Sequence, residues 1–105
     1  MIKAVYIKGR DVVGLSVKGH SGYAESGKDI VCAAVSALVE SMRLYLRECP
    51  YCSVREDGEA ILMAATIAYE PAFDMVNLGL RALAEQYPDN VEIVVQPFRN
   101  GNDKR

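Results

Sequence analysis

One histidine and one cysteine, twelve positions apart, are the residues of this sequence best suited to nucleophilic chemistry. His20, the only histidine of the chain, lies in a glycine-rich segment that follows a β-rich run. Cys32 comes three residues after Asp29, which we predict to be the N-cap of a helix. The unpaired amides and the positive dipole end of a helix N-terminus stabilise a thiolate there. A thiolate beside an imidazolium can attack a carbonyl, and the same amides can form an oxyanion hole.

Each of these residues also has a plainer interpretation. Cys32 can be a small buried hydrophobic side chain, as free cysteines in Ala- and Val-rich helices usually are. From the residues alone, a catalytic and a packing role for Cys32 are about equally well supported. Ser36 lies four residues later on the same helix face, where it can hold the thiol or a substrate carbonyl, or bond back to the Cys32 carbonyl. Asp29 can orient the His20 ring instead of capping the helix. A carboxylate in that place would oppose the thiolate, so we favour the cap.

A second candidate is the motif Cys49-Pro50-Tyr51-Cys52, which as a bare string is a redox dithiol. It predicts a thiol-disulfide oxidoreductase that uses Cys49 and Cys52. The position disagrees with this function, because Cys49 closes a predicted helix, at the negative end of the dipole. A zinc site would need two further ligands, and only Cys32 and His20 remain. We therefore expect neither a metal nor a cofactor.

The pattern around these residues predicts an α+β fold with the element order ββαββαβ. Segment 19–28 breaks all periodicity, with three glycines and two serines, and is predicted to be a loop. Both predicted helices carry one apolar face, so we expect them to pack on a mostly antiparallel sheet. The length fits a single domain over residues 1–105. The expected elements are strands over 2–8 and 12–17, a helix from 29 to about 48, strands over 53–57 and 60–69 that turn at Asp57-Gly58, a helix that begins at Pro71, and a strand over 91–98.

The apolar faces of the two predicted helices give the expected core residues. On the first helix they are Val31, Ala34, Val35, Leu38, Met42, Tyr45 and Leu46, and on the second Phe73, Val76, Leu80, Leu83, Ala84 and Tyr87.

Composition excludes several classes of function. Twelve Lys and Arg against fourteen Asp and Glu, with no basic stripe, argue against direct binding of nucleic acid. No window is apolar enough to span a bilayer, and Lys3, Lys8 and Arg10 interrupt any signal-peptide core. We therefore expect a cytoplasmic protein with no membrane contact. Three cysteines, an odd number, argue against a disulfide framework.

Gly19-His20-Ser21, together with Gly27-Lys28-Asp29-Ile30-Val31-Cys32 and Ser36, resembles the signature of the ribosomal-processing cysteine protease family. That pattern has Gly-His-Ala, a short variable loop, and then Gly-x-Asp-Ile-Val-Cys followed one turn later by Ser. The resemblance extends to the length, the opening hairpin and the second helix. The one visible departure is Ser21 in place of alanine, and since both are small we expect altered loop polarity with activity retained.

The resemblance implies a thiol protease with Cys32 as nucleophile and His20 as general base and acid. The loop would be a flap over the bound peptide. The implied substrate is the precursor of large-subunit ribosomal protein twenty-seven, cut after an aromatic residue to remove an N-terminal extension during ribosome maturation. The resemblance also implies a homodimer. A non-catalytic ribosome-assembly module, with Cys32 as buried packing, is the remaining alternative. The residues that would support the protease site are Gly19, Ser21, Gly22, Gly27, Asp29 and Ser36.

Overall fold

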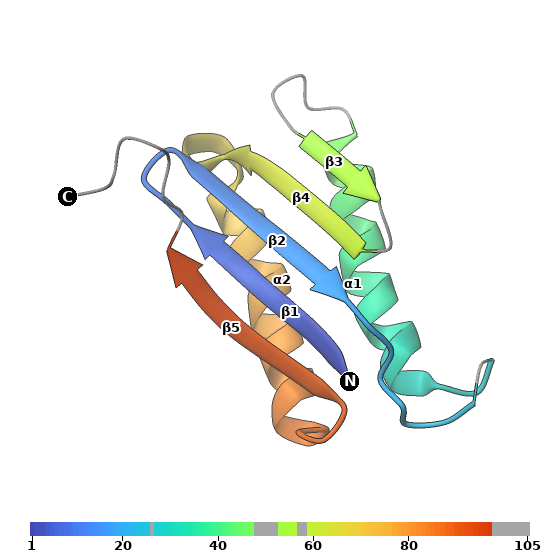
Figure 1. Cartoon of the computed structure of the whole chain (residues 1–105). Helices are drawn as coiled ribbons and strands as arrows, with labels where there is room; N and C mark the ends of the chain where they lie inside the picture. Colours follow the sequence, from blue (N-terminus) through green and yellow to red (C-terminus); the bar gives the residue numbers. More distant parts are fainter. Residues whose placement is uncertain (26, 48–52, 57–58, 98–105) are drawn as a thin grey trace.

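The described part of the chain forms one five-stranded sheet with two helices on the same face (Figure 1). A computed structural model describes residues 1–25, 27–47, 53–56 and 59–97, with backbone alone for 53–56 and 59–67. The elements are β1 (Ile2–Lys8), β2 (Val12–Lys18), α1 (Ile30–Leu46), β3 (Ser53–Glu56), β4 (Glu59–Ala65), α2 (Thr66–Gln86) and β5 (Val91–Pro97). This confirms the predicted order ββαββαβ and the α+β class.

The strands lie in the order β3-β4-β2-β1-β5, and three of the four neighbouring pairs are antiparallel. The exception is β5, which runs parallel to β1 because α2 carries the chain back across the sheet before β5 begins. A short turn joins β1 to β2, closed by the Gly9 amide, which donates to the Val12 carbonyl over 2.8 Å. The sheet is therefore mostly antiparallel, as predicted. Its order places β1 and β2 centrally, so the loop after β2 begins in the middle of the sheet.

The core lies between the sheet and the two helices. Alternate residues of β1 and β2 point toward the helices and are buried, as period-two alternation requires. The predicted helix faces are largely confirmed, with two differences on α1: Tyr45 is 57% exposed and packs edge-on against Tyr69, whereas Val39 is buried. Neither described helix is long and apolar enough to cross a membrane. The buried residues are Ile2, Ala4, Tyr6, Val13, Leu15, Val17, Val31, Val35, Val39, Met42, Leu46, Phe73, Val76, Leu80 and Val91.

The boundary between β4 and α2 differs from the prediction. The helix begins at Thr66, directly after the strand, so residues 66–69 are helical and Pro71 lies inside the helix. A continuous apolar run fits a strand and a buried helix equally, and no turn residue marks the change. Pro71 is the sixth residue of this helix, beyond the first turn, so it costs the helix one backbone hydrogen bond. The first helix ends at Leu46 with Arg47 as C-cap, slightly earlier than predicted. The turn predicted at Asp57-Gly58 lies outside the described residues.

Candidate active site

The N-terminus of α1 is organised by the Asp29 carboxylate. Asp29 is the N-cap, as predicted, because its Oδ1 accepts the Cys32 amide over 2.8 Å. The Asp29 carbonyl accepts the Ala33 amide over 3.0 Å. The other carboxylate oxygen, Oδ2, accepts the Ser21 hydroxyl. The Ser21 bond, followed by the Cys32 amide, lowers the pKa of the Asp29 carboxyl below its ordinary value. Both carboxylate oxygens are therefore engaged, and neither bonds to His20.

The loop between β2 and α1 begins with a tight backbone approach. Gly19 has φ +96°, and a Cβ there would overlap the Met1 carbonyl oxygen, so only glycine fits. Gly22 and Gly27 also have positive φ values, of +71° and +89°, but both have open space where a Cβ would lie. The loop thus uses all three glycines for their backbone freedom, and Gly19 for its lack of a side chain as well.

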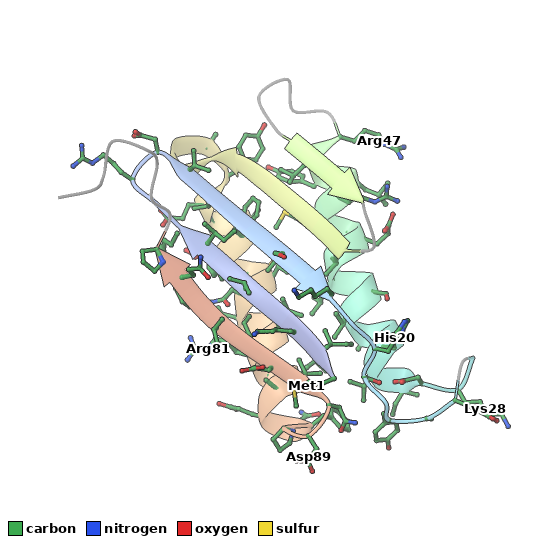
Figure 2. The ribbon with its side chains drawn as sticks, in the orientation of Figure 1. Met1, His20, Lys28, Arg47, Arg81 and Asp89 are labelled. Atoms are coloured by element: carbon green, nitrogen blue, oxygen red, sulfur yellow. The ribbon has the colours of Figure 1, made fainter. Side chains whose placement is uncertain are left out.

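His20 and Cys32 border the same hollow. His20 is exposed, and Figure 2 shows its side chain beside α1, whereas Lys28 at the far end of the loop points away from the body of the protein. Cys32 is a half-buried free thiol in the first turn of α1. The hollow includes six of the eight residues singled out from the sequence. It has a volume of about 430 Å³ and is lined by His20, Gly22, Ala24, Gly27, Asp29, Cys32, Ala33 and Ser36.

A second hollow, of about 230 Å³, opens on the other side of Cys32. Cys32 and Ser36 line both hollows, so these two side chains lie where the hollows adjoin. Lys18 and Glu40 supply charge to the second hollow, and Glu40 is held by an ion pair with Arg43 one helical turn along. A thiol where two hollows adjoin can meet a peptide bond in one hollow while a neighbouring side chain of the peptide occupies the other. The apolar part of the second hollow consists of Ile2, Val17, Val35 and Val39.

The Ser36 hydroxyl has no hydrogen-bond partner among the residues that the structure describes. It is exposed and makes no hydrogen bond with another described residue, so of the alternatives given for Ser36 the back-bond to the Cys32 carbonyl is not formed. Ser41, one turn and a residue further along α1, does form such a bond, donating to the Ala37 carbonyl over 2.7 Å. The Ser36 hydroxyl is thus available to a molecule in either hollow.

The amides at the start of α1 correct one expectation. The sequence predicted free amides that could form an oxyanion hole around Cys32. In the structure the Cys32 and Ala33 amides both donate to Asp29, one to its side chain and one to its carbonyl. These two donors are therefore already engaged.

The sequence matches the profile of the family described as cysteine protease Prp over residues 1–92. The chain belongs to this family. The ribosomal processing cysteine protease Prp of Mycoplasma genitalium is 32% identical over 85 residues, covering 75% of this chain and 84% of that protein. Ribosomal processing by a cysteine protease is therefore the activity of the family to which this chain belongs.

Solved structures share the fold. The crystal structure of SMU.848 from Streptococcus mutans has 29% identity and a TM-score of 0.67, and covers 93% of this chain and 96% of that one. The ribosomal processing protease Prp from S. aureus, solved with a covalently linked product peptide, has 19% identity and a TM-score of 0.78. That similarity covers 91% of this chain and all of the S. aureus chain, and it establishes the Prp fold for this protein.

Three residues near the Prp site were missed by the sequence interpretation. The Asn90 side-chain amide donates to the Ser21 carbonyl over 2.9 Å, although the two residues are 69 positions apart. The Tyr23 ring lies edge-on to Tyr87, with centroids 5.4 Å apart. In the sequence, Pro88-Asp89-Asn90 signalled only the end of a helix, and Tyr87 only a core position. Nothing local connects them to a loop near residue 21.

Among the described residues, no group of three His, Cys, Asp or Glu side chains could hold a metal ion. The Cys49-Pro50-Tyr51-Cys52 motif lies outside the described residues.

Proposed function

We propose that this Prp-family chain is an endopeptidase with Cys32 as nucleophile and His20 as general base and acid. One observation carries the proposal: His20 and Cys32, from different elements, line a single hollow that is open to a peptide. In the reaction the Cys32 sulfur bonds to the scissile carbonyl carbon, and the C–N bond breaks as His20 protonates the leaving amine. Water, deprotonated by His20, then cleaves the thioester and releases the free thiol.

We infer that the substrate is the precursor of large-subunit ribosomal protein twenty-seven, which loses a short N-terminal extension. The relative from Mycoplasma genitalium is a ribosomal processing protease, and the S. aureus protease has been solved with a substrate peptide and with a covalently linked product peptide. The apolar part of the second hollow supports cleavage after an aromatic residue, because it adjoins Cys32 and can bury a ring.

The remaining residues have supporting roles in this proposal. Ser36 binds the substrate carbonyl, Asp29 caps the helix that carries Cys32, and segment 19–28 closes over the bound peptide. The proposal further includes a cytoplasmic homodimer, which rests on the family resemblance. Light scattering of the purified chain tests the dimer. A monomer mass at the concentration used for the cleavage assay would contradict it.

Intact mass spectrometry of the precursor after incubation with the chain tests the peptidase function. We expect one N-terminal truncation with the unmodified chain and none with Cys32→Ala or His20→Ala, because each variant lacks one partner of the proposed pair. Ser41→Ala is the matched control, since Ser41 lies on the same helix and, within the described part of the chain, bonds only to the Ala37 carbonyl. Cleavage by Cys32→Ala would disprove the assignment of the nucleophile.

Cys49→Ser is a second control. We expect it to cleave normally, because Cys49 takes no part in the proposed reaction. Loss of cleavage in Cys49→Ser together with an active Cys32→Ala would instead support the oxidoreductase.

A further inference from the structure

The hydroxyl of Ser21 is buried in a loop whose other described side chains are half-buried or exposed. Ser21 is 2% exposed and is the one polar residue found buried among the residues whose side chains are described. A buried hydroxyl is retained at low cost only where it is fully hydrogen-bonded. Its Oγ donates to Asp29 Oδ2 and accepts the Tyr23 amide over 3.1 Å. The hydroxyl thus serves as both donor and acceptor within this loop.

These bonds belong to a longer connected path. Asn90 donates its side-chain amide to the Ser21 carbonyl, and its own carbonyl accepts the Ile2 amide over 2.8 Å at the start of β1. Asp29, the acceptor of the Ser21 hydroxyl, holds the Cys32 amide with its other oxygen. The path therefore runs from the turn before β5, through Ser21 and Asp29, to the backbone of Cys32.

The path holds the first part of the loop. Gly19 is packed against the Met1 carbonyl, and Ser21 is bonded through its hydroxyl and its carbonyl, so the backbone on both sides of His20 is held. Tyr23 adds the ring contact with Tyr87. The nearby Tyr23 and Ala24 amides make smaller contributions to the lowered pKa of the Asp29 carboxyl.

The second part of the loop has fewer contacts with the body of the protein. Its described residues Glu25, Gly27 and Lys28 are exposed. The contacts found among them are local: the Lys28 amide donates to the Glu25 carbonyl over 3.0 Å, and the two side chains form an ion pair. The part of the loop that carries His20 is thus anchored to the fold, whereas these residues are bonded to one another.

We propose that Ser21 is a positioning residue that couples the backbone of His20 to the helix start that carries Cys32. It holds the backbone on both sides of His20 in place before substrate arrives. The inference rests on the proposed pair of His20 and Cys32 and adds to it the residue that positions one partner relative to the other. Preorganisation of this kind raises the rate of the chemical step more than it tightens binding.

Ser21→Ala is the central test, and it introduces the residue that the resembled pattern carries, so we expect the variant to fold. We expect kcat for the precursor peptide to fall about tenfold with KM changed less than twofold, a difference equivalent to about 1.4 kcal/mol. Hydrogen exchange gives a direct readout, because the Tyr23 amide loses its Ser21 acceptor and with it its protection, whereas amides within α1 keep theirs. Asn90→Asp, which replaces the donor to the Ser21 carbonyl, should lower kcat in the same direction.

Alkylation of Cys32 by iodoacetamide at pH 7 supplies a readout without substrate. We expect it to slow in His20→Ala and, by a smaller factor, in Ser21→Ala, while Ser41→Ala matches the unmodified chain. Unchanged kcat and alkylation in Ser21→Ala, or a Tyr23 amide that stays protected, would overturn the positioning role. Cleavage by Cys32→Ala or His20→Ala would instead overturn the proposed function, so the two failures are distinguishable.

Discussion

Replacing Gly19 with alanine should destabilise the protein far more than the same change at Gly22. Both glycines lie in the loop after β2 with positive φ, at +96° and +71°. An alanine Cβ at Gly22 meets nothing within 4 Å, whereas at Gly19 it would overlap the Met1 carbonyl oxygen. The two variants therefore share the conformational penalty and differ in the steric one.

The size of the effect follows from what holds that carbonyl. A left-handed conformation costs an L-residue about 1–2 kcal/mol, and this is the whole penalty we expect for Gly22→Ala. The peptide group that carries the Met1 oxygen also carries the Ile2 amide, which donates to the Asn90 carbonyl over 2.8 Å, and Ile2 is 2% exposed. Displacing this group resembles overpacking, at about 1–3 kcal/mol. Gly19→Ala should therefore cost about 2–5 kcal/mol in total.

Urea unfolding followed by far-UV circular dichroism measures both variants. With an m-value of about 1–1.5 kcal/mol/M for a domain of this size, the extra steric cost lowers the midpoint of Gly19→Ala by about 1 M or more relative to Gly22→Ala. Peptide cleavage should fall in Gly19→Ala too, because His20 is the next residue. Midpoints that agree within about 0.3 M, at equal m-values, would show that the peptide group after Met1 moves at little energetic cost. That result would refute the steric penalty assigned to Gly19→Ala.

Two further predictions concern the core and its edge. Leu80→Ala should lower the free energy of unfolding by about 2–5 kcal/mol, because Leu80 is 0% exposed and its truncation leaves a cavity. Leu78→Ala, at a residue 61% exposed, should lower it by only about 0.5 kcal/mol in the same urea titration, and equal losses would contradict the assigned core. Burial, followed by the bond to Asp74, raises the pKa of the Tyr6 phenol, so the stability from its protonated form is present below about pH 10 and lost as pH rises further. Tyr6→Phe should lower the free energy of unfolding by about 1–2 kcal/mol at pH 7. The melting temperature of the variant should also decline less steeply above about pH 10. An equally steep decline in the variant would contradict this role.

The sequence predicted those features whose signals are local. Asp29 followed by an apolar period of three and four residues specifies a helix start, and the structure has that cap. The predicted start of α2 was wrong because an apolar run without turn residues gives the same signal in a strand and in a buried helix. Pro71 was the nearest residue that signals a helix start, whereas the helix begins at Thr66. The bond between Asn90 and Ser21 had no signal at all, since it depends on how the sheet brings the turn before β5 to the loop after β2.

The same locality explains why two of the amides expected to be free for an oxyanion are already engaged. The pattern assigned two roles to the amides at the start of α1, as partners of the Asp29 cap and as donors to a substrate oxyanion, but one N–H makes one strong hydrogen bond. In the structure Asp29 Oδ1 takes the Cys32 amide. The Ser21 hydroxyl and this amide lower the pKa of the Asp29 carboxyl, so the carboxylate stays charged and keeps its donors. The Ser36 hydroxyl gives up no bond to a described residue and lines both hollows beside Cys32. We therefore expect Ser36 to stabilise a developing oxyanion at lower cost than the Cys32 amide, whose use would break the cap that holds Cys32 in place.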